Sequence, residues 1–379
     1  MKGDGEALRG GVTIGKLFGI SLRLNYSWFI IFALVTWALA TGYFPAIYPN
    51  WSLATSIFTG LVTSLLFFGS VLAHELMHSL VAQASGIPVS SITLFIFGGV
   101  SQITEEPKEP KVELRIALAG PLTSIALGGI FWAIWFLLPG TAEVVTAVAF
   151  WLGLINLVLA GFNLIPGFPL DGGRVLRSIL WWRSRNLRRA TKTASNIGQG
   201  VGFLFIFGGL WLIFSGLWLN GLWLALIGWF LGNAAVGSYR QLALQQMLQG
   251  HAASEIMTRD CLIVHPDTTI EKLVNEHILP SGHRCFAVAA DSHVLGLITL
   301  QNVKAVPRNL WATKMVREVM TPFENLKWVR PDEDLYSVLR TLTEQDVNQL
   351  PVVEEGKIVG MVARDNLLSF INVRDKLGI

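Results

Sequence analysis

The sequence contains little cysteine and little charge. Two cysteines, Cys261 and Cys285, are too few for a disulfide framework or a cysteine-based metal site. Only 15% of the 379 residues are charged, whereas about a quarter are charged in an average soluble domain. The formal net charge of +3 is too small to indicate a nucleic-acid-binding protein, so we expect no direct contact with nucleic acid. A membrane protein is the first expectation.

Apolar residues are concentrated before about residue 245, where Leu, Ile, Phe, Trp, Gly and Ala dominate. Six stretches approach the roughly 20 apolar residues that a helix needs to cross the hydrocarbon core. They are residues 26–45, 53–82, 112–138, 144–166, 198–216 and 218–238. The chain is therefore expected to divide into a transmembrane domain over residues 1–245 and a soluble domain over residues 252–379.

Lys and Arg are absent from one set of connections between these stretches. Residues 43–53, 138–145 and 215–222 contain none, whereas the N-terminal segment and residues 108–115 and 174–192 are basic. With six spans the basic segments fall on one side, which the charge distribution identifies as cytoplasmic. We expect a multi-pass protein of the inner or plasma membrane with both termini and the soluble domain in the cytoplasm. The N-terminus lacks the features of a cleaved signal peptide, so the first span is expected to be retained.

Residues 87–103, between the second and third stretches, are rich in β-branched and aromatic residues. With Gly98 and Gly99 they predict strands with a turn or bulge. An open strand edge cannot face lipid, so this segment must pack against helices or line a wet cavity. It is either a hairpin without a chemical role or an edge that binds an extended peptide, and the second alternative makes Gly98 and Gly99 candidate substrate-binding residues.

The second stretch contains His74-Glu75-Leu-Met-His78, and these histidines are the only two in the first 250 residues. Two residues four apart on a helix share a face and lie about 6 Å apart along the axis. Both imidazoles can thus reach one metal ion, with Glu75 beside the open coordination position. Such side chains are costly in an apolar span unless they bind a metal or line a polar cavity. The alternative is a hydrogen-bonded His/Glu cluster or a proton relay.

A hydrolytic zinc site needs a third protein ligand. Asp171 is the remaining carboxylate near the end of an apolar span, and its segment, residues 163–174, contains prolines that break a helix and glycines that allow close backbone approach. The predicted orientation brings His78 and Asp171 to matching depths. The alternative for Asp171 is a helix-stop or Asx-turn residue.

These motifs together resemble the site-2 protease family of intramembrane zinc metalloproteases. The resemblance rests on the HExxH helix, on the Asn-x-x-Pro-x-x-Pro-x-Asp-Gly segment that begins at Asn163, and on Ala119-Gly120-Pro121. One departure is Ser124, which stands where relatives often have asparagine. Ser124 is therefore not included among the predicted site residues.

The resemblance implies a zinc metalloendopeptidase that cleaves a transmembrane or juxtamembrane peptide bond in regulated intramembrane proteolysis. One Zn²⁺ per chain is implied, with the ligands His74, His78 and Asp171. Glu75 is implied as the catalytic base, and Asn163 as a group that holds the substrate backbone or the oxyanion. The implied partners are the lipid bilayer and a membrane-anchored protein, such as the precursor of a transcriptional regulator or an anti-sigma factor.

The soluble domain contains an internal repeat. Ile256-Met-Thr and Val319-Met-Thr begin two segments that share the order of a Pro-Asp pair, an amphipathic helix and two apolar strands. These repeats, about residues 252–310 and 315–373, resemble a tandem CBS domain. The predicted fold class is therefore an α-helical polytopic membrane domain of about six transmembrane helices with a small membrane-associated β segment, followed by a soluble α/β tandem CBS domain.

The CBS resemblance implies a cleft for an adenine nucleotide and a homodimer through the CBS domains. In repeats that bind adenosyl nucleotides, the Asp of a Thr-x-x-Asp sequence holds the ribose. Here the candidate cofactor residues are Thr299, Asn302 and Asn366, so asparagine replaces the expected Asp in both repeats. The alternative is a dimerisation or substrate-filter module.

Two other functions are compatible with a membrane domain followed by a CBS pair. A CBS-regulated transporter would usually contain an internal repeat in its membrane half, and none is evident. A catalytically silent scaffold would lack Glu75 or one of the metal ligands, and all four residues are present.

Overall fold

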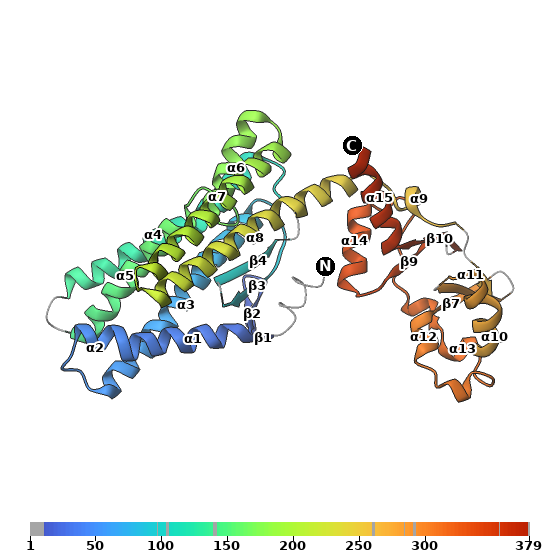
Figure 1. Ribbon diagram of the computed structural model, residues 1–379, viewed down its shortest axis with the longest axis horizontal. Helices are drawn as coiled ribbons and strands as arrows, with labels where there is room; N and C mark the ends of the chain where they lie inside the picture. Colours follow the sequence, from blue (N-terminus) through green and yellow to red (C-terminus); the bar gives the residue numbers. More distant parts are fainter. Residues whose placement is uncertain are drawn as a thin grey trace. The chain divides into compact units, whose positions relative to one another are not determined.

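The computed structural model describes residues 11–96, 98–103, 106–138, 142–259, 262–283, 285–290, 293–355 and 357–377 (Figure 1). Cys261 and most of the basic N-terminal segment lie outside these residues. The chain divides into two compact units, Met1–Arg240 and Gln241–Ile379, which are described separately. The predicted fold class is confirmed, since the first unit carries the membrane helices with a small sheet and the second is an α/β CBS pair.

Among the described residues, six helices are long and apolar enough to cross a membrane. They are Tyr26–Ile47, Leu53–Ala84, Pro110–Leu137, Glu143–Asn163, Leu187–Phe214 and Trp218–Leu248. The first consists of α1 (Tyr26–Ala38), η1 (Leu39–Tyr43) and α2 (Phe44–Ile47), and the others are α3, α4, α5, α7 and α8 in that order. All six expected spans are present.

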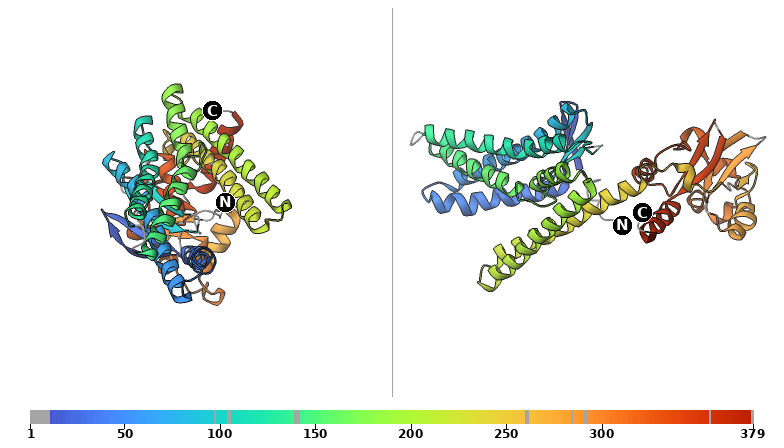
Figure 2. Two further views of the ribbon diagram at one scale, coloured as in Figure 1. Left: turned by 90° about the vertical axis from the view of Figure 1, so that its left-hand side faces the viewer. Right: turned by 90° about the horizontal axis from the view of Figure 1, so that it is seen from above.

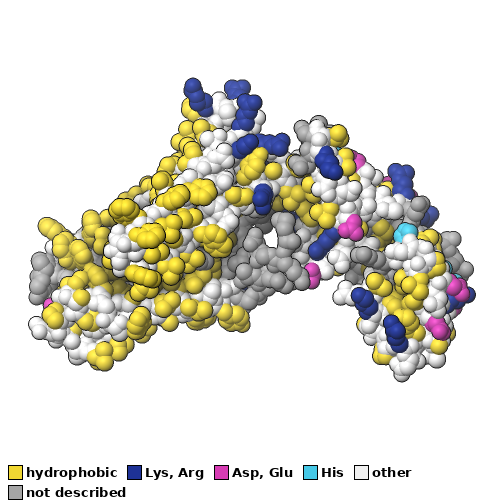
Figure 3. Space-filling model, viewed as in Figure 1, with side chains coloured by type: hydrophobic (Ala, Val, Ile, Leu, Met, Phe, Trp, Pro, Cys, Tyr) yellow, Lys and Arg dark blue, Asp and Glu magenta, His cyan; other side chains and the backbone are white. Residues whose placement is uncertain are grey.

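The outer surface of the membrane unit is apolar, as a lipid-facing surface requires. Phe136, Phe214 and Leu219 are each at least three-quarters exposed, and yellow side chains cover the helices in Figure 3. Inside the unit, α7 and α8 pack through glycines. A Cβ on Gly202 would lie 2.7 Å from the Gly228 carbonyl oxygen, so the two backbones are in direct contact.

A four-stranded sheet lies at one end of the helical bundle (Figures 1 and 2). Its strands follow the order β1 (Gly11–Leu17), β2 (Ile20–Asn25), β3 (Val89–Phe95) and β4 (Gly98–Ile103). β2 and β3 are parallel, and the other two pairs are antiparallel. The strands predicted within residues 87–103 are therefore present, whereas the hairpin of β1 and β2 is an addition. β4 is an edge strand.

The sheet packs on the half of α3 that carries the histidines. Ile20 from β2, Ile92 from β3 and Ile116 from α4 are fully buried in one cluster together with Ala82 of α3. Burial of apolar side chains stabilises the fold by about 25 cal/mol per Å², so this cluster holds the strands against the helices. The consequence is that β4 runs directly beside α3.

Residues 171–184, expected only as part of a basic connection, form a further helix, α6 (Asp171–Ser184). A tight turn over residues 164–170 joins α5 to α6, and α6 ends at Arg185 in the left-handed conformation. The helix packs against both α4 and α7. This packing places Asp171, the first residue of α6, inside the bundle instead of in a surface loop.

The described residues of the second unit form two sheets, one for each repeat. The first has the strand order β5 (Ile263–Val264), β6 (Cys285–Ala290), β7 (His293–Thr299) and β8 (Thr321–Pro322), and the second pairs β9 (Gln349–Glu354) with β10 (Lys357–Ala363). The helices are α9 (Ala253–Ile256), α10 (Ile270–Lys272), η2 (Leu273–Ile278), α11 (Leu279–Ser281), α12 (Leu300–Lys304), η3 (Arg308–Leu310), α13 (Val316–Val319), η4 (Phe323–Asn325), α14 (Leu335–Glu344) and α15 (Arg364–Leu377).

The two repeats exchange their first segments. β8 begins the second repeat but pairs with β7 of the first repeat. Reciprocally, Thr258 from the start of the first repeat forms a β-bridge with Met361 in β10 of the second. Each sheet is therefore completed by the other repeat, so the repeats fold as one unit.

Candidate metal centre

The two histidines lie on one face of α3 and are almost completely buried, with exposed fractions of 3% for His74 and 4% for His78. Their Nε2 atoms are 3.2 Å apart. Spacing of four residues on a helix accounts for this approach, because one turn brings the second side chain above the first.

Each imidazole is oriented through its other nitrogen by α4. His78 Nδ1 lies 2.6 Å from the Ile116 carbonyl oxygen, which can only accept, so Nδ1 carries the proton and Nε2 presents a lone pair. His74 Nδ1 lies 2.9 Å from the Ser124 hydroxyl. The carbonyl fixes the tautomer of His78, and both contacts fix the ring orientation that a metal-binding histidine needs.

Gly120 of α4 provides the space for both rings. A Cβ at this position would lie 2.5 Å from His74 Nε2 and closer still to His78 Nε2. Any side chain here would therefore occupy the position where the two Nε2 atoms converge.

Asp171 reaches the histidines from the first turn of α6. Gly172 and Gly173, which follow it, are buried against the preceding turn, where an added Cβ would overlap the backbone. The partial positive charge at a helix N-terminus favours a carboxylate at this position.

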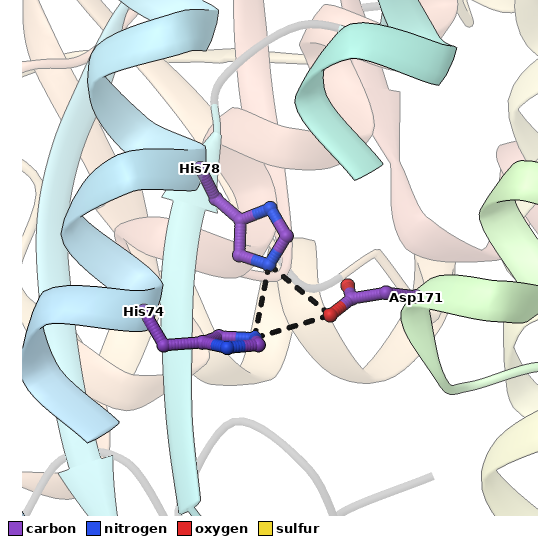
Figure 4. Close-up of side chains that lie close together, drawn as sticks. All are labelled: His74, His78 and Asp171. Atoms are coloured by element: carbon purple, nitrogen blue, oxygen red, sulfur yellow. Dashed lines mark hydrogen bonds and ion pairs between the residues drawn. The ribbon is translucent and has the colours of Figure 1, made fainter. Parts of the chain in front are cut away.

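The three donor atoms converge on one point (Figure 4). Asp171 Oδ2 lies 3.1 Å from His74 Nε2 and 3.2 Å from His78 Nε2. A tetrahedral zinc ion with ligand distances near 2.0–2.1 Å holds its ligand atoms about 3.3 Å apart. Two neutral imidazoles and one carboxylate at these distances therefore fit Zn²⁺ with one position left for water.

Glu75 lies beside this cluster and is clamped by β4. Ser101 donates a hydrogen bond to Glu75 Oε2 at 3.1 Å, and Ser79 in turn donates to Ser101. Gly99, two residues before Ser101 and so on the same face of the strand, packs on the side chain, since an added Cβ would lie 2.9 Å from Glu75 Cδ. Gly98 has a φ of +130°, which other residues rarely adopt.

Asn163, predicted to contact substrate, ends α5, and its side-chain amide donates to the Leu159 carbonyl oxygen at 3.1 Å. The structure thus brings Glu75, Gly99 and the three candidate ligands together. The side chain of Asn163 bonds instead to the backbone of its own helix, α5.

The predicted nucleotide residues of the CBS pair lie at two corresponding positions. Asn302 accepts hydrogen bonds from the backbone N–H and the hydroxyl of Thr299, and its amide lies 3.5 Å from the Thr321 hydroxyl. Asn366 accepts from the Ala363 N–H and donates to the Thr258 hydroxyl at 3.3 Å. Both asparagines therefore cap a helix and connect it to the segment exchanged from the other repeat.

Two site residues were missed by the sequence analysis. Ser124 lies one helical turn from Gly120 and contacts His74. Ser101 lies two residues from Gly99 and contacts Glu75. The helical spacing of four and the strand spacing of two could have indicated both residues.

The chain matches two families. Peptidase family M50 matches over residues 62–146 and 140–209, and the CBS domain matches over residues 253–308 and 316–373. The first match contains every candidate ligand and Glu75, and the second covers both repeats.

Several relatives are similar over nearly their whole length. The chain is 36% identical to sll0528 of Synechocystis over 96% of both chains, and 34% identical to Rip3 of Mycobacterium tuberculosis over 97% of this chain and 94% of that protein; both are named as candidate zinc metalloproteases. It is 31% identical to the zinc metalloprotease MJ0392 of Methanocaldococcus jannaschii over 96% of both chains. Among solved structures, the site-2 protease from Methanocaldococcus jannaschii matches at 31% identity with a TM-score of 0.42, over 60% of this chain and 95% of that chain.

Proposed function

The chain belongs to peptidase family M50 and is a membrane metalloprotease, and on this premise we propose that it cleaves a transmembrane or juxtamembrane peptide bond of a membrane-anchored protein. The proposed zinc ligands are His74, His78 and Asp171. The observation that carries this proposal is the convergence of their three donor atoms within 3.2 Å. Zinc bound there would supply the positive charge that polarises the scissile carbonyl and acidifies the attacking water.

Glu75 is the proposed general base. It accepts the proton of the attacking water and returns it to the leaving amine. The hydrogen bond from Ser101 is made to Oε2, so Oε1 is the oxygen proposed to take the proton. Contact with Gly99 restricts the side chain, so its carboxylate is held in place before substrate binds.

The substrate is proposed to bind as an extended strand along β4. A transmembrane helix has its amides bonded internally, so the scissile segment must unwind before attack. Addition to the open edge of β4 would replace the lost backbone hydrogen bonds. Because Gly99 and Ser101 of the same strand contact Glu75, a peptide on that edge would lie close to the general base. Gly98, Gly99 and Asn163 are the proposed substrate contacts.

The cellular setting is proposed from the distribution of charge. The Lys- and Arg-rich connections favour an inner or plasma membrane location with both termini and the CBS pair in the cytoplasm. The CBS pair is proposed as the regulatory module of the protease and as its dimer contact. Adenine nucleotide is its proposed ligand, held weakly because Asn302 and Asn366 lack the carboxylate of the repeats that they resemble.

Cleavage of a single-span peptide by the full-length protein in liposomes tests this function. We expect Glu75→Gln to lower the cleavage rate by about 10²- to 10⁴-fold, the usual contribution of a general base, while one zinc ion per chain is retained. The matched control is Glu143→Gln. Glu143 is the first residue of α5, and its carboxylate accepts a hydrogen bond from the Trp51 side chain. It should cleave at the wild-type rate.

Other outcomes identify the competing functions. A wild-type protein without stoichiometric zinc would favour the transporter. Zinc without cleavage of any single-span peptide would favour the scaffold. A strong chelator should abolish cleavage, and zinc should restore it.

A further inference from the structure

A buried ion pair joins α4 to α6 beside the metal centre. Glu113, in the first turn of α4, is completely buried, and Arg177, in the middle of α6, is only 6% exposed. Arg177 Nε donates to Glu113 Oε1 at 2.5 Å, and Nη2 donates to the same oxygen. The guanidinium also lies over the ring of Phe168, 5.2 Å from its centroid. The chemistry proposed above assigns this pair no role.

Two other charged groups face the pair at longer range. Glu106, which follows β4, lies 3.7 Å from Arg177 Nη1, and Arg174 Nε lies 4.0 Å from Glu113 Oε1. Both distances exceed those of direct hydrogen bonds. The bonds between Glu113 and Arg177 are therefore the closest of these charge contacts.

An ion pair at this depth contributes little net stability. Removing two charges from water is costly, and the attraction between them offsets that cost only in part, so an apolar pair of similar size is often as stable. What the ion pair adds is direction, because Nε and Nη2 of the planar Arg177 guanidinium both bond Glu113 Oε1 and so fix the position of that oxygen relative to α6. Its presence favours a role in setting geometry.

The geometry that the pair can set is that of Asp171. Arg177 lies six residues after Asp171 on the same helix, about 9 Å along its axis. Over less than two turns a helix moves as a rigid unit. Fixing Arg177 against α4 therefore fixes both the rotation and the axial position of the residue that begins α6.

The same face of α4 also positions both histidines. Glu113, Ile116, Gly120 and Ser124 follow one another at intervals of three and four residues, so they share one side of the helix. Ile116 and Ser124 hold the two Nδ1 atoms, and Gly120 leaves space for the rings. Glu113 belongs to the same row and, through Arg177, connects it to α6, which carries the third candidate ligand.

We propose that Glu113 and Arg177 are positioning residues that fix α6 on α4 and so hold the Asp171 carboxylate within ligand distance of His74 and His78. One face of α4 is then the common reference for all three metal ligands. This inference rests on the proposed metal site. Because the pair acts through Asp171, it controls metal affinity and not the binding of substrate.

Zinc affinity of the purified full-length protein tests this role, measured by competition with a chromophoric chelator. Arg177→Met should weaken zinc binding by about 10- to 100-fold, the usual effect of losing a group that orients a ligand. The matched control is Arg183→Met, the same substitution at an exposed position in the last turn of α6. It should bind zinc within about twofold of wild type.

A paired variant separates positioning from simple stability, since Arg177→Met leaves Glu113 buried without its partner. Glu113→Leu combined with Arg177→Met leaves neither charge of the pair, so the metal-free protein should unfold at the wild-type temperature. Its zinc affinity should still be at least tenfold weaker, with KM for a peptide substrate unchanged. Wild-type zinc affinity in the paired variant would overturn this inference and leave the proposed function intact, whereas a wild-type protein that binds no zinc would overturn both.

Discussion

The two units of the chain differ in where they bury titratable side chains. Among the described residues, the most buried ones are His74, His78, Glu113 and Arg177, all in the membrane unit and all in contact with α4 or α6. In the CBS unit, by contrast, Asn302 and Asn366 lie in the first turn of a helix and bond a backbone N–H. A buried titratable side chain in the membrane unit therefore indicates a functional site. A polar residue that matches a motif in the CBS unit can instead be there to bond the backbone of its own helix.

The units also differ in symmetry. Asn302 with Thr321 and Asn366 with Thr258 are equivalent contacts across the two CBS repeats. The site of the membrane unit joins four unlike elements, α3, β4, α4 and α6. Single substitutions should consequently cause large losses of activity at the membrane site. In the CBS unit they should change stability only slightly, and by similar amounts at equivalent positions of the two repeats.

The largest effect is expected at Gly120. Gly120→Ala places a methyl group 2.5 Å from His74 Nε2 and even closer to His78 Nε2, so at least one ring must move. Displacements of about 1 Å in an active site cost on the order of 10²-fold in rate, and we expect at least that loss of cleavage together with loss of zinc. Activity assays and metal analysis of the same preparation measure both.

Gly129→Ala is the matched control on the same helix. No atom lies within 4 Å of a Cβ added at Gly129, and alanine is the better helix former. This variant should cleave normally and unfold at an equal or slightly higher temperature. Equal activity of the two alanine variants would contradict the assignment of the site to the face of α4.

An intermediate effect is expected at Ser101. Ser101→Ala removes a hydrogen bond to the Glu75 carboxylate, and bonds to charged groups contribute about 1.5–3 kcal/mol. We expect kcat to fall by about tenfold or more while KM and zinc content stay unchanged. The control is Ser90→Ala in β3, where an exposed hydroxyl donates to the Gln102 carbonyl oxygen. A rise in KM alone would indicate a role in binding substrate instead.

Local patterns in the sequence predicted most of the fold. The six spans follow from the length of their apolar runs, and β3 and β4 follow from β-branched residues beside Gly98 and Gly99. The parallel pairing of β2 with β3 joins residues that are 70 apart, such as Ser21 and Ser91, and no local pattern reports it. α6 was missed because its arginines indicated a surface connection, whereas Arg177 is buried against Glu113.

The candidate site divides in the same way. Residue type and spacing predicted His74, Glu75, His78 and Asp171, because these side chains are rare in an apolar span. The partners that orient them were not predictable by residue type. His78 is held by a backbone carbonyl, that of Ile116, which every residue possesses. In the CBS unit, resemblance to the Thr-x-x-Asp sequence indicated Asn302 and Asn366 as nucleotide-binding residues. In the structure each side chain accepts a hydrogen bond from the backbone N–H at the start of a helix.

A smaller effect is expected from these two asparagines. Asn302→Ala and Asn366→Ala each remove a hydrogen bond to the backbone at the start of a helix and a contact between the repeats, and loss of one such hydrogen bond costs about 1 kcal/mol. Hydrogen exchange of the full-length protein should show faster exchange throughout the CBS unit and no change around His74. Asn302→Asp, which keeps the acceptor oxygen, should largely preserve stability. Equal exchange in all these variants would show that the caps contribute nothing.

The smallest effect is expected at Glu255 in α9, which tests whether charges in the CBS unit act only locally. The Ala252 backbone N–H donates a hydrogen bond to the Glu255 carboxylate, and the His251 side chain forms a second one. These two bonds hold the pKa of Glu255 below its usual range. A carboxyl whose pKa is lower in the folded state stabilises that state above its unfolded pKa, and this contribution is lost as the pH falls through the folded pKa. Because Glu255 is exposed, the stabilisation should amount to a few tenths of a kcal/mol.

Hydrogen exchange over residues 251–257 should therefore accelerate as the pH falls below about 4.3, beyond the intrinsic pH dependence of exchange, and Glu255→Gln should remove that acceleration. An effect as large as that of Gly120→Ala would contradict the distinction between the two units, because an exposed pair in water gains far less than a buried side chain at a metal centre.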